Sequence, residues 1–221
     1  MYRVRLNKER LRNHIQYDWW KYVVCIIVTI AVWNLITTVT RPQTPPDKKI
    51  EIFLVGNYVL EESAMAISDR IIEDFPNLWE VNINNIALDK EDPQLDYMSR
   101  QKLMVMLASQ TGDIYAFDKE EFAKIVEQGA FIPLDEFIED NRSLIGDDRL
   151  EKAERIGTEF DSEPHYYGIP MDGLELFKNT GYDVSDKVIG MTIFSENPSM
   201  AVEVLKWILN DGEKVIEADM N

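Results

Sequence analysis

Cysteine and histidine are almost absent from this chain, and their scarcity excludes several kinds of site. The single cysteine, Cys25, lies inside an apolar run, so no disulfide can form within the chain and a reactive thiol is not expected. Of the two histidines, His14 precedes the apolar run, and His165 stands beside two tyrosines, as packing or surface histidines do. A histidine-rich metal site is therefore excluded, and a Ser-His-Asp triad would depend on His165 alone.

Catalytic and nucleotide-binding motifs are missing as well. The sequence contains no G-x-S-x-G turn, no P-loop and no H-E-x-x-H motif. Carboxylates gather in segments such as 89–92 and 147–151, but neither has the spacing of a calcium loop with its central glycine and terminal Glu. We therefore predict no catalytic residues, no metal ligands and no cofactor, and we interpret the acidic residues as a solvated face.

Basic residues are few, and many of them lie near the N-terminus. The chain of 221 residues has 23 Lys and Arg against 40 Asp and Glu, a formal net charge of −17. Seven of the basic residues but only two of the acidic ones precede residue 47, which leaves residues 47–221 with a net charge of −22. Because binding to a phosphate backbone needs clustered Lys and Arg, nucleic acid is excluded as a partner.

One long apolar run, 22–39, carries no charge across eighteen positions. That length is near the lower end for a helix that crosses a bilayer, about 17–25 residues, and Trp19, Trp20 and Trp33 stand where interfacial rings gather. No small-residue cleavage site follows the run, which favours an uncleaved signal anchor over a signal peptide. Six of the seven basic residues precede the run, so we expect the N-terminus to stay in the cytoplasm.

These features predict a single-pass protein of the cell membrane with four parts. They are a basic cytoplasmic segment (1–19), a transmembrane helix in contact with membrane lipid (20–40), a Pro-rich spacer (41–49) and an extracytoplasmic domain (50–221).

The extracytoplasmic part alternates apolar strands with amphipathic helices. Strands are expected near 50–55, 80–87, 113–117 and 188–194, and helices near 60–76, 92–112, 119–128 and 198–209. Asp118 is expected to cap the third of these helices in a capping box with Glu121, Gly129 to end it in a left-handed conformation, and Asn197 to cap the last helix. The alternation predicts an α/β fold, a three-layer sheet with helices on both faces.

The order of these segments resembles a known family. "IEIFLVGNY" (50–58), "GDIYAFDKEEFAKIVEQGAFIPLDEF" (112–137), "YGIPMDG" (167–173) and "VIGMTIFSENPSMAVEVLKWIL" (188–209) follow one another as in the first lobe of the extracellular solute-binding proteins of ABC importers. The resemblance implies one lobe of a type 2 periplasmic-binding fold. That family inserts a whole second lobe between the last two segments, whereas only fourteen residues separate them here, so the resemblance implies a member reduced to a single lobe on a membrane anchor.

Five residues are candidate ligand contacts. In open α/β sheets, ligands sit at the carboxyl ends of the strands. The expected strands place these residues there: Asn57, Tyr58, Asp118, Met171 and Asp172. The resemblance implies contacts with a sugar or another solute at such positions. Other roles stay open, because Asp118 also suits a helix cap and Tyr58 a surface aromatic.

Two functions therefore remain open. In the first, the domain is an accessory to ABC-type transport or sensing and acts through protein contacts, with a membrane transporter or a full-length binding protein as partner. In the second, it is a true receptor for a small solute, a sugar or a peptide, bound at the carboxyl ends of the strands. Half a cleft buries too little of a small ligand for tight binding, which favours the first function.

Overall fold

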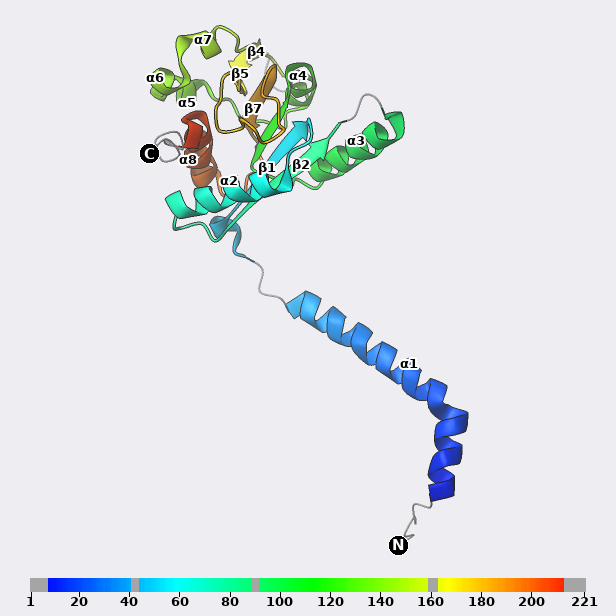
Figure 1. The fold of residues 1–221 in the computed structure, drawn as a ribbon. Coiled ribbons are helices and arrows are strands. Elements are labelled where there is room, and N and C mark those ends of the chain that lie inside the picture. Colours follow the sequence, from blue (N-terminus) through cyan, green and yellow to red (C-terminus); the bar gives the residue numbers. More distant parts are fainter. Residues whose placement is uncertain (1–7, 41–43, 89–91, 159–162, 213–221) are drawn as a thin grey trace. The chain divides into compact units, whose positions relative to one another are not determined.

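The computed structural model of the protein describes residues 8–40, 44–88, 92–158 and 163–212 (Figure 1). The chain divides into two compact units, Met1–Gln43 and Thr44–Asn221. Part of the predicted basic segment, 1–7, and part of the predicted spacer, 41–43, lie outside the described residues.

The described residues of the first unit form one helix, α1 (Lys8–Thr40). Its segment Trp19–Thr38 has 20 residues and a mean hydropathy of 1.7, so it is long and apolar enough to cross a membrane, a test that a signal sequence at this position would also pass. The hydroxyls of Thr29 and Thr40 donate to carbonyls one turn earlier, at 2.8 and 2.6 Å, and therefore need no partner from a surrounding lipid phase. The predicted apolar helix is present, and its orientation across a membrane stays a prediction.

The second unit is built on a five-stranded sheet with the order β2-β1-β3-β7-β6. β1 (Lys49–Gly56) lies between β2 (Glu80–Ala87) and β3 (Ile114–Asp118) and runs parallel to both. β7 (Lys187–Met191) runs antiparallel to β3, and the short β6 (Ile169–Pro170) runs antiparallel to β7. All four predicted strands therefore lie in one sheet.

Helices cover both faces of this sheet, because successive side chains of each strand point to opposite sides. Ile52 of β1 belongs to the core cluster that includes residues of α2 (Glu61–Asp74) and α8 (Pro198–Leu209). Its neighbour Phe53 belongs to the second cluster, with residues of α3 (Pro93–Ala108) and α4 (Lys119–Glu127). The predicted three-layer α/β architecture is confirmed.

Shorter elements complete the domain. They are the 3-10 helix η1 (Pro46–Lys48), the helices α5 (Asp135–Asp140), α6 (Arg142–Ile145) and α7 (Asp147–Leu150), and the paired strands β4 (Arg155–Ile156) and β5 (His165–Tyr166).

The predicted helix caps are only partly right. Gly129 follows α4 with a φ of 76°, as a left-handed helix end requires. Asp118 precedes α4 but its side chain makes no capping hydrogen bond, because its carboxylate pairs with Lys187 instead. Glu121 does not complete a capping box either, since its carboxylate lies 3.0 Å from a guanidinium nitrogen of Arg100. The cap predicted at α8 fails for the same kind of reason.

At α8, the side chain of Asn197 is drawn to a distant segment. Its Nδ2 donates at 2.8 Å to the carbonyl of Asp47 in η1, and no capping bond to its own helix forms. The contact ties the start of α8 to the segment that enters β1. Local cap preferences are therefore overridden here by tertiary partners.

Candidate functional site

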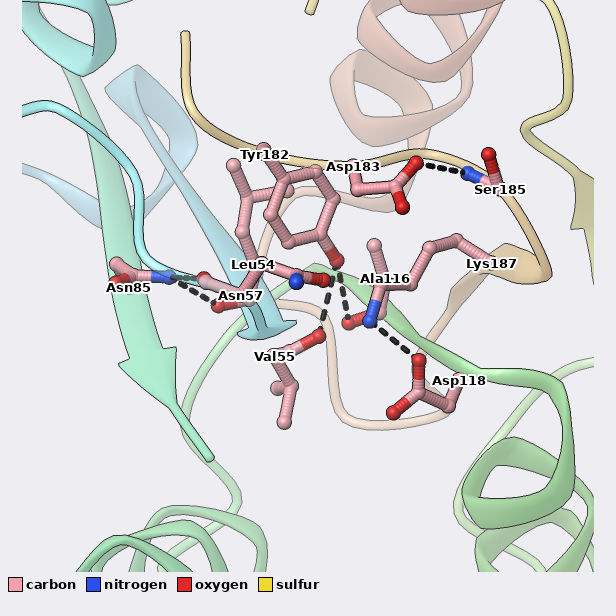
Figure 2. Close-up of polar contacts among 10 residues, drawn as sticks. All are labelled: Leu54, Val55, Asn57, Asn85, Ala116, Asp118, Tyr182, Asp183, Ser185 and Lys187. Atoms are coloured by element: carbon pink, nitrogen blue, oxygen red, sulfur yellow. Dashed lines mark hydrogen bonds and ion pairs between the residues drawn. The ribbon is translucent and has the colours of Figure 1, made fainter. Parts of the chain in front are cut away.

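The parallel strands β1, β2 and β3 end at one edge of the sheet, where the sequence predicts a ligand site (Figure 2). Asn85 of β2 fixes the loop that follows β1. Its Nδ2 donates to the carbonyls of Leu54 and Asn57, at 3.0 and 2.8 Å, and its Oδ1 accepts from the backbone N–H of Val59 at 3.3 Å. The amide of Asn85 is thus used within the protein, and so is the carbonyl of Asn57.

A buried lysine lies beside this loop at the same edge. Lys187, the first residue of β7, stands directly opposite Asp118, the last residue of β3. Its side chain is 2% exposed, and its Nζ lies 2.5 Å from Oδ1 of Asp118 and 5.4 Å from the centre of the Tyr182 ring. The Asp118 side chain is 39% exposed, so the ammonium group of the pair is shielded from solvent and the carboxylate is in contact with it.

Gly56 makes room for this ammonium group. A Cβ atom at position 56 would lie 2.2 Å from Nζ of Lys187. The residue also has a φ of 120°, a conformation that side chains with a Cβ rarely adopt. A glycine at the end of β1 is therefore needed for the lysine to reach between the strand ends.

Tyr182 fills the same edge from the connection between β6 and β7. Its hydroxyl donates to the carbonyl of Val55 at 3.0 Å and lies 3.5 Å from the carbonyl of Ala116 (Figure 2). Burial, and secondarily the charge of Asp118, raises the pKa of the Tyr182 hydroxyl far above its ordinary value. The group stays protonated and donates to the carbonyl of Val55 near the end of β1.

The rest of the connection, 171–186, is also packed against the domain. Leu174 and Phe177 are buried in the core. The carbonyl of Thr180 accepts from the N–H of Leu60 at 2.8 Å, and Oδ1 of Asp211 accepts from two backbone N–H groups of the connection. At the point where the resemblance implies an inserted lobe, the chain instead folds back over the edge of its own sheet.

The structure places the five predicted ligand contacts in different surroundings. Asn57 and Asp118 lie at the same edge (Figure 2), whereas Tyr58 is 63% exposed. Met171 is completely buried, because the chain turns into the core after β6, and a ligand cannot reach it at the surface in this conformation. Asp172 lines a cavity of about 330 Å³ that Lys187 also lines, and its carboxylate lies 3.1 Å from Nζ of Lys152. Ligand binding by the four accessible residues stays a prediction.

Sequence reasoning missed the two residues that dominate this edge, Lys187 and Tyr182. A lysine at the head of the apolar strand "KVIGM" and an aspartate at the tail of another strand form a possible cross-strand pair. That signal becomes readable only once the two strands are known to be antiparallel neighbours. Tyr182 gives no comparable signal, because its connection has no regular period.

A second cavity, of about 510 Å³, lies by the short helices and the β4–β5 pair. Its lining consists of Asp135, Ile138, Glu139, Arg142, Asp147, Leu150, Glu151, Arg155 and Tyr166. The guanidinium of Arg155 lies 4.6 Å from the centre of the Tyr166 ring, and Oδ2 of Asp135 lies 2.9 Å from Nδ1 of His165. In the described part of the chain, no three His, Cys, Asp or Glu side chains are grouped to hold a metal ion.

Comparisons with known proteins give similarity at the level of structure. No protein-family model and no curated protein matches the sequence. Among solved structures, an extracellular solute-binding protein family 1 member from Alicyclobacillus acidocaldarius is 19% identical, with 58% of this chain and 29% of that chain covered and a TM-score of 0.42. An ABC substrate-binding protein from Listeria monocytogenes, in complex with cycloalternan, is 17% identical, with 54% and 28% covered and a TM-score of 0.38.

A third similar structure is the N-glycan transport solute-binding protein from Streptococcus pneumoniae in complex with Man5GlcNAc. It is 17% identical, with 55% of this chain and 24% of that chain covered and a TM-score of 0.37. The chain thus spans less than a third of the length of each of these three proteins. Over rather more than half of its own length, the chain is similar in structure to solute-binding proteins.

Proposed function

We propose that the protein is a membrane-anchored, extracytoplasmic domain of solute-binding-protein type that serves ABC-type transport or sensing as an accessory, through protein contacts. The observation that carries the proposal is the filled carboxyl edge of the sheet. The Tyr182 hydroxyl donates to the carbonyl of Val55 near the end of β1, and Lys187 and Asp118 form an ion pair beside it. The side chains of Asn85, Tyr182 and Lys187 at this edge are already paired within the chain.

The energetics of small-ligand binding support this choice. Sites for small molecules bury about 70–90% of the ligand surface, which one lobe with a filled edge does not offer. We therefore expect free solutes to bind with a Kd of about 1 mM or weaker, equivalent to about 4 kcal/mol or less. We expect no catalytic activity, because the charged groups at this edge, Lys187 and Asp118, are paired with each other.

The apolar helix supplies the second half of the proposal. A domain held to the bilayer by α1 shares two dimensions with membrane-bound partners, which raises their effective concentration without any new contact. A membrane transporter or a full-length binding protein is therefore the kind of partner that we propose. Modest affinity would be sufficient for such a complex.

Calorimetry with the full-length protein in detergent micelles tests the proposal. The solute panel contains short peptides, simple sugars and cycloalternan, the ligand of one similar structure. We expect no binding tighter than about 1 mM. Micromolar binding of any solute, lost in a folded Asp118→Ala variant but kept in the control Asp140→Ala, would favour a true solute receptor. Asp140 is a suitable control because it is an exposed aspartate of α5, away from the edge.

A further inference from the structure

The strand β2 forms an open border of the sheet. It pairs with β1 only, so within the described residues the outer N–H and C=O groups of its eight positions face no other strand. At the other border, β6 has only two residues. A long free edge is a template for another extended chain, and proteins commonly protect such edges with lysine, proline or a bulge. The sequence of β2, EVNINNIA, contains neither lysine nor proline.

A groove of about 360 Å³ runs along this strand, between β2 and α2. Val81 and Ile83 of β2 and Ile72 of α2 contribute apolar surface to it. Two further lining residues are strongly exposed, Trp79 at 65% and Met65 at 57%. A strand added beside β2 would direct every second side chain toward α2, and therefore toward this groove.

The charge of the groove determines which kind of partner segment can bind there. Glu61 and Asp69 of α2 and Glu80 of β2 line the groove, and its described lining includes no Lys or Arg. Hydrogen bonds, first from the hydroxyl of Thr44 and then from the amide of Asn82, lower the pKa of the Glu80 carboxyl and keep it ionised. The groove therefore favours a basic partner.

The same charge opposes a second copy of this chain as the occupant. Two copies paired through β2 would bring two sets of these carboxylates together. The domains that carry them, each with a net charge of −22 over residues 47–221, would also repel each other.

We propose that the β2 edge binds an extended segment of a partner protein in which apolar and basic residues alternate, so that the segment becomes a sixth strand of the sheet. Its backbone pairs with β2, its apolar side chains pack against Val81 and Ile83, and the carboxylates that line the groove, those of Glu61, Asp69 and Glu80, attract its basic side chains. This inference rests on the proposed function, in which the domain acts through protein contacts, and it names the surface and the partner chemistry.

Synthetic peptides test the mode of binding. A ten-residue peptide of alternating valine and lysine is titrated into the full-length protein in detergent micelles, with hydrogen exchange read along the chain. We expect binding at least tenfold tighter than for a valine–glutamate peptide, with slowed exchange in residues 80–87. A valine–lysine peptide N-methylated along one backbone edge has the same charge but cannot pair on that side, and it should also bind at least tenfold more weakly. Equal binding of the methylated peptide, or protection elsewhere in the chain, would overturn the proposal.

Variants of α2 test the role of charge. The double change Glu61→Lys with Asp69→Lys should weaken binding of the valine–lysine peptide at least tenfold. Glu62→Lys with Glu73→Lys makes the same change in charge on exposed residues of the same helix that do not line the groove, and should leave affinity within twofold. Equal losses of affinity in the two variants would show that net charge alone causes the effect and would refute binding of the peptide in the groove.

The outcomes separate this inference from the proposed function. If the valine–lysine peptide does not bind and free solutes still bind with a Kd of about 1 mM or weaker, the strand-edge site is overturned and the accessory function is not affected. Micromolar solute binding overturns the accessory function whatever the peptide does. A dimer of the full-length protein with residues 80–87 protected from exchange would assign the edge to a second copy and contradict the proposed partner.

Discussion

The ion pair between Lys187 and Asp118 predicts an unequal response to its two single substitutions. The ammonium side chain is 2% exposed and the carboxylate side chain 39%. Removing the carboxylate in Asp118→Ala leaves a buried charge without its counter-charge, a change that typically costs about 3–5 kcal/mol. We expect the lower end, about 3 kcal/mol, which is a loss of more than 100-fold in the ratio of folded to unfolded protein.

Removing the lysine should be far milder. Lys187→Met keeps most of the buried alkyl volume, and the carboxylate of Asp118 left behind is already in contact with water. We expect a loss of less than about 1 kcal/mol. The double variant should resemble Lys187→Met, so that the two effects are coupled by about 2–3 kcal/mol.

Urea denaturation of the full-length protein in detergent micelles, followed by near-ultraviolet circular dichroism, measures these differences. Glu175→Ala serves as a control because it breaks the exposed pair with Lys178 and should cost less than about 1 kcal/mol. Equal losses in the two single variants of the buried pair, or a double variant as unstable as Asp118→Ala, would refute the reasoning from burial.

Three further predictions concern Tyr182, Gly190 and the membrane topology. Tyr182→Phe should cost about 1 kcal/mol at neutral pH, because the carbonyl of Val55 loses its donor. The native state of the wild type keeps the Tyr182 proton above about pH 10, where the unfolded chain loses it, so stability should fall as pH rises in denaturation series, and fall less steeply in this variant. Gly190→Ala should cost about 1–3 kcal/mol in thermal unfolding, since a Cβ there would lie 2.7 Å from the Tyr167 carbonyl oxygen; an unchanged midpoint would contradict this. Protease added to intact spheroplasts should remove residues 47–221, and a protected domain would contradict the predicted orientation.

Most of the fold was predictable because it depends on local periodicity. Residues 80–87 are expected as a strand and form β2, and the strand expected at 50–55 is β1, which has one more residue at each end. In β1 and β3, successive apolar side chains enter two different cores, a pattern that predicts helices on both faces. Such signals lie within a few residues of each other and survive in any tertiary context.

The candidate site was not predictable to the same degree, because it depends on which distant segments meet. Asp118 fits the local rule for a helix cap, yet a lysine 69 positions later takes its carboxylate. Met171 follows a strand, as expected of a ligand contact at the carboxyl end of a sheet, but the connection after β6 turns inward and buries it. A connection without a periodic pattern of apolar residues takes a path that depends on packing against distant segments, and this path cannot be predicted from a short stretch of sequence.

The pairing of β3 with β7 also has a consequence for the order in which the chain folds. Asp118 and Lys187 are partners separated by 69 positions, so at typical synthesis rates β3 waits roughly 3–14 s for its neighbour. During that interval β1, β2 and β3 can associate, but β3 presents an unpaired border that invites intermolecular association. Nascent domains that arrive close together would be at risk of aggregation until β7 is inserted, and a holdase that shields β3 would raise the yield of folded protein.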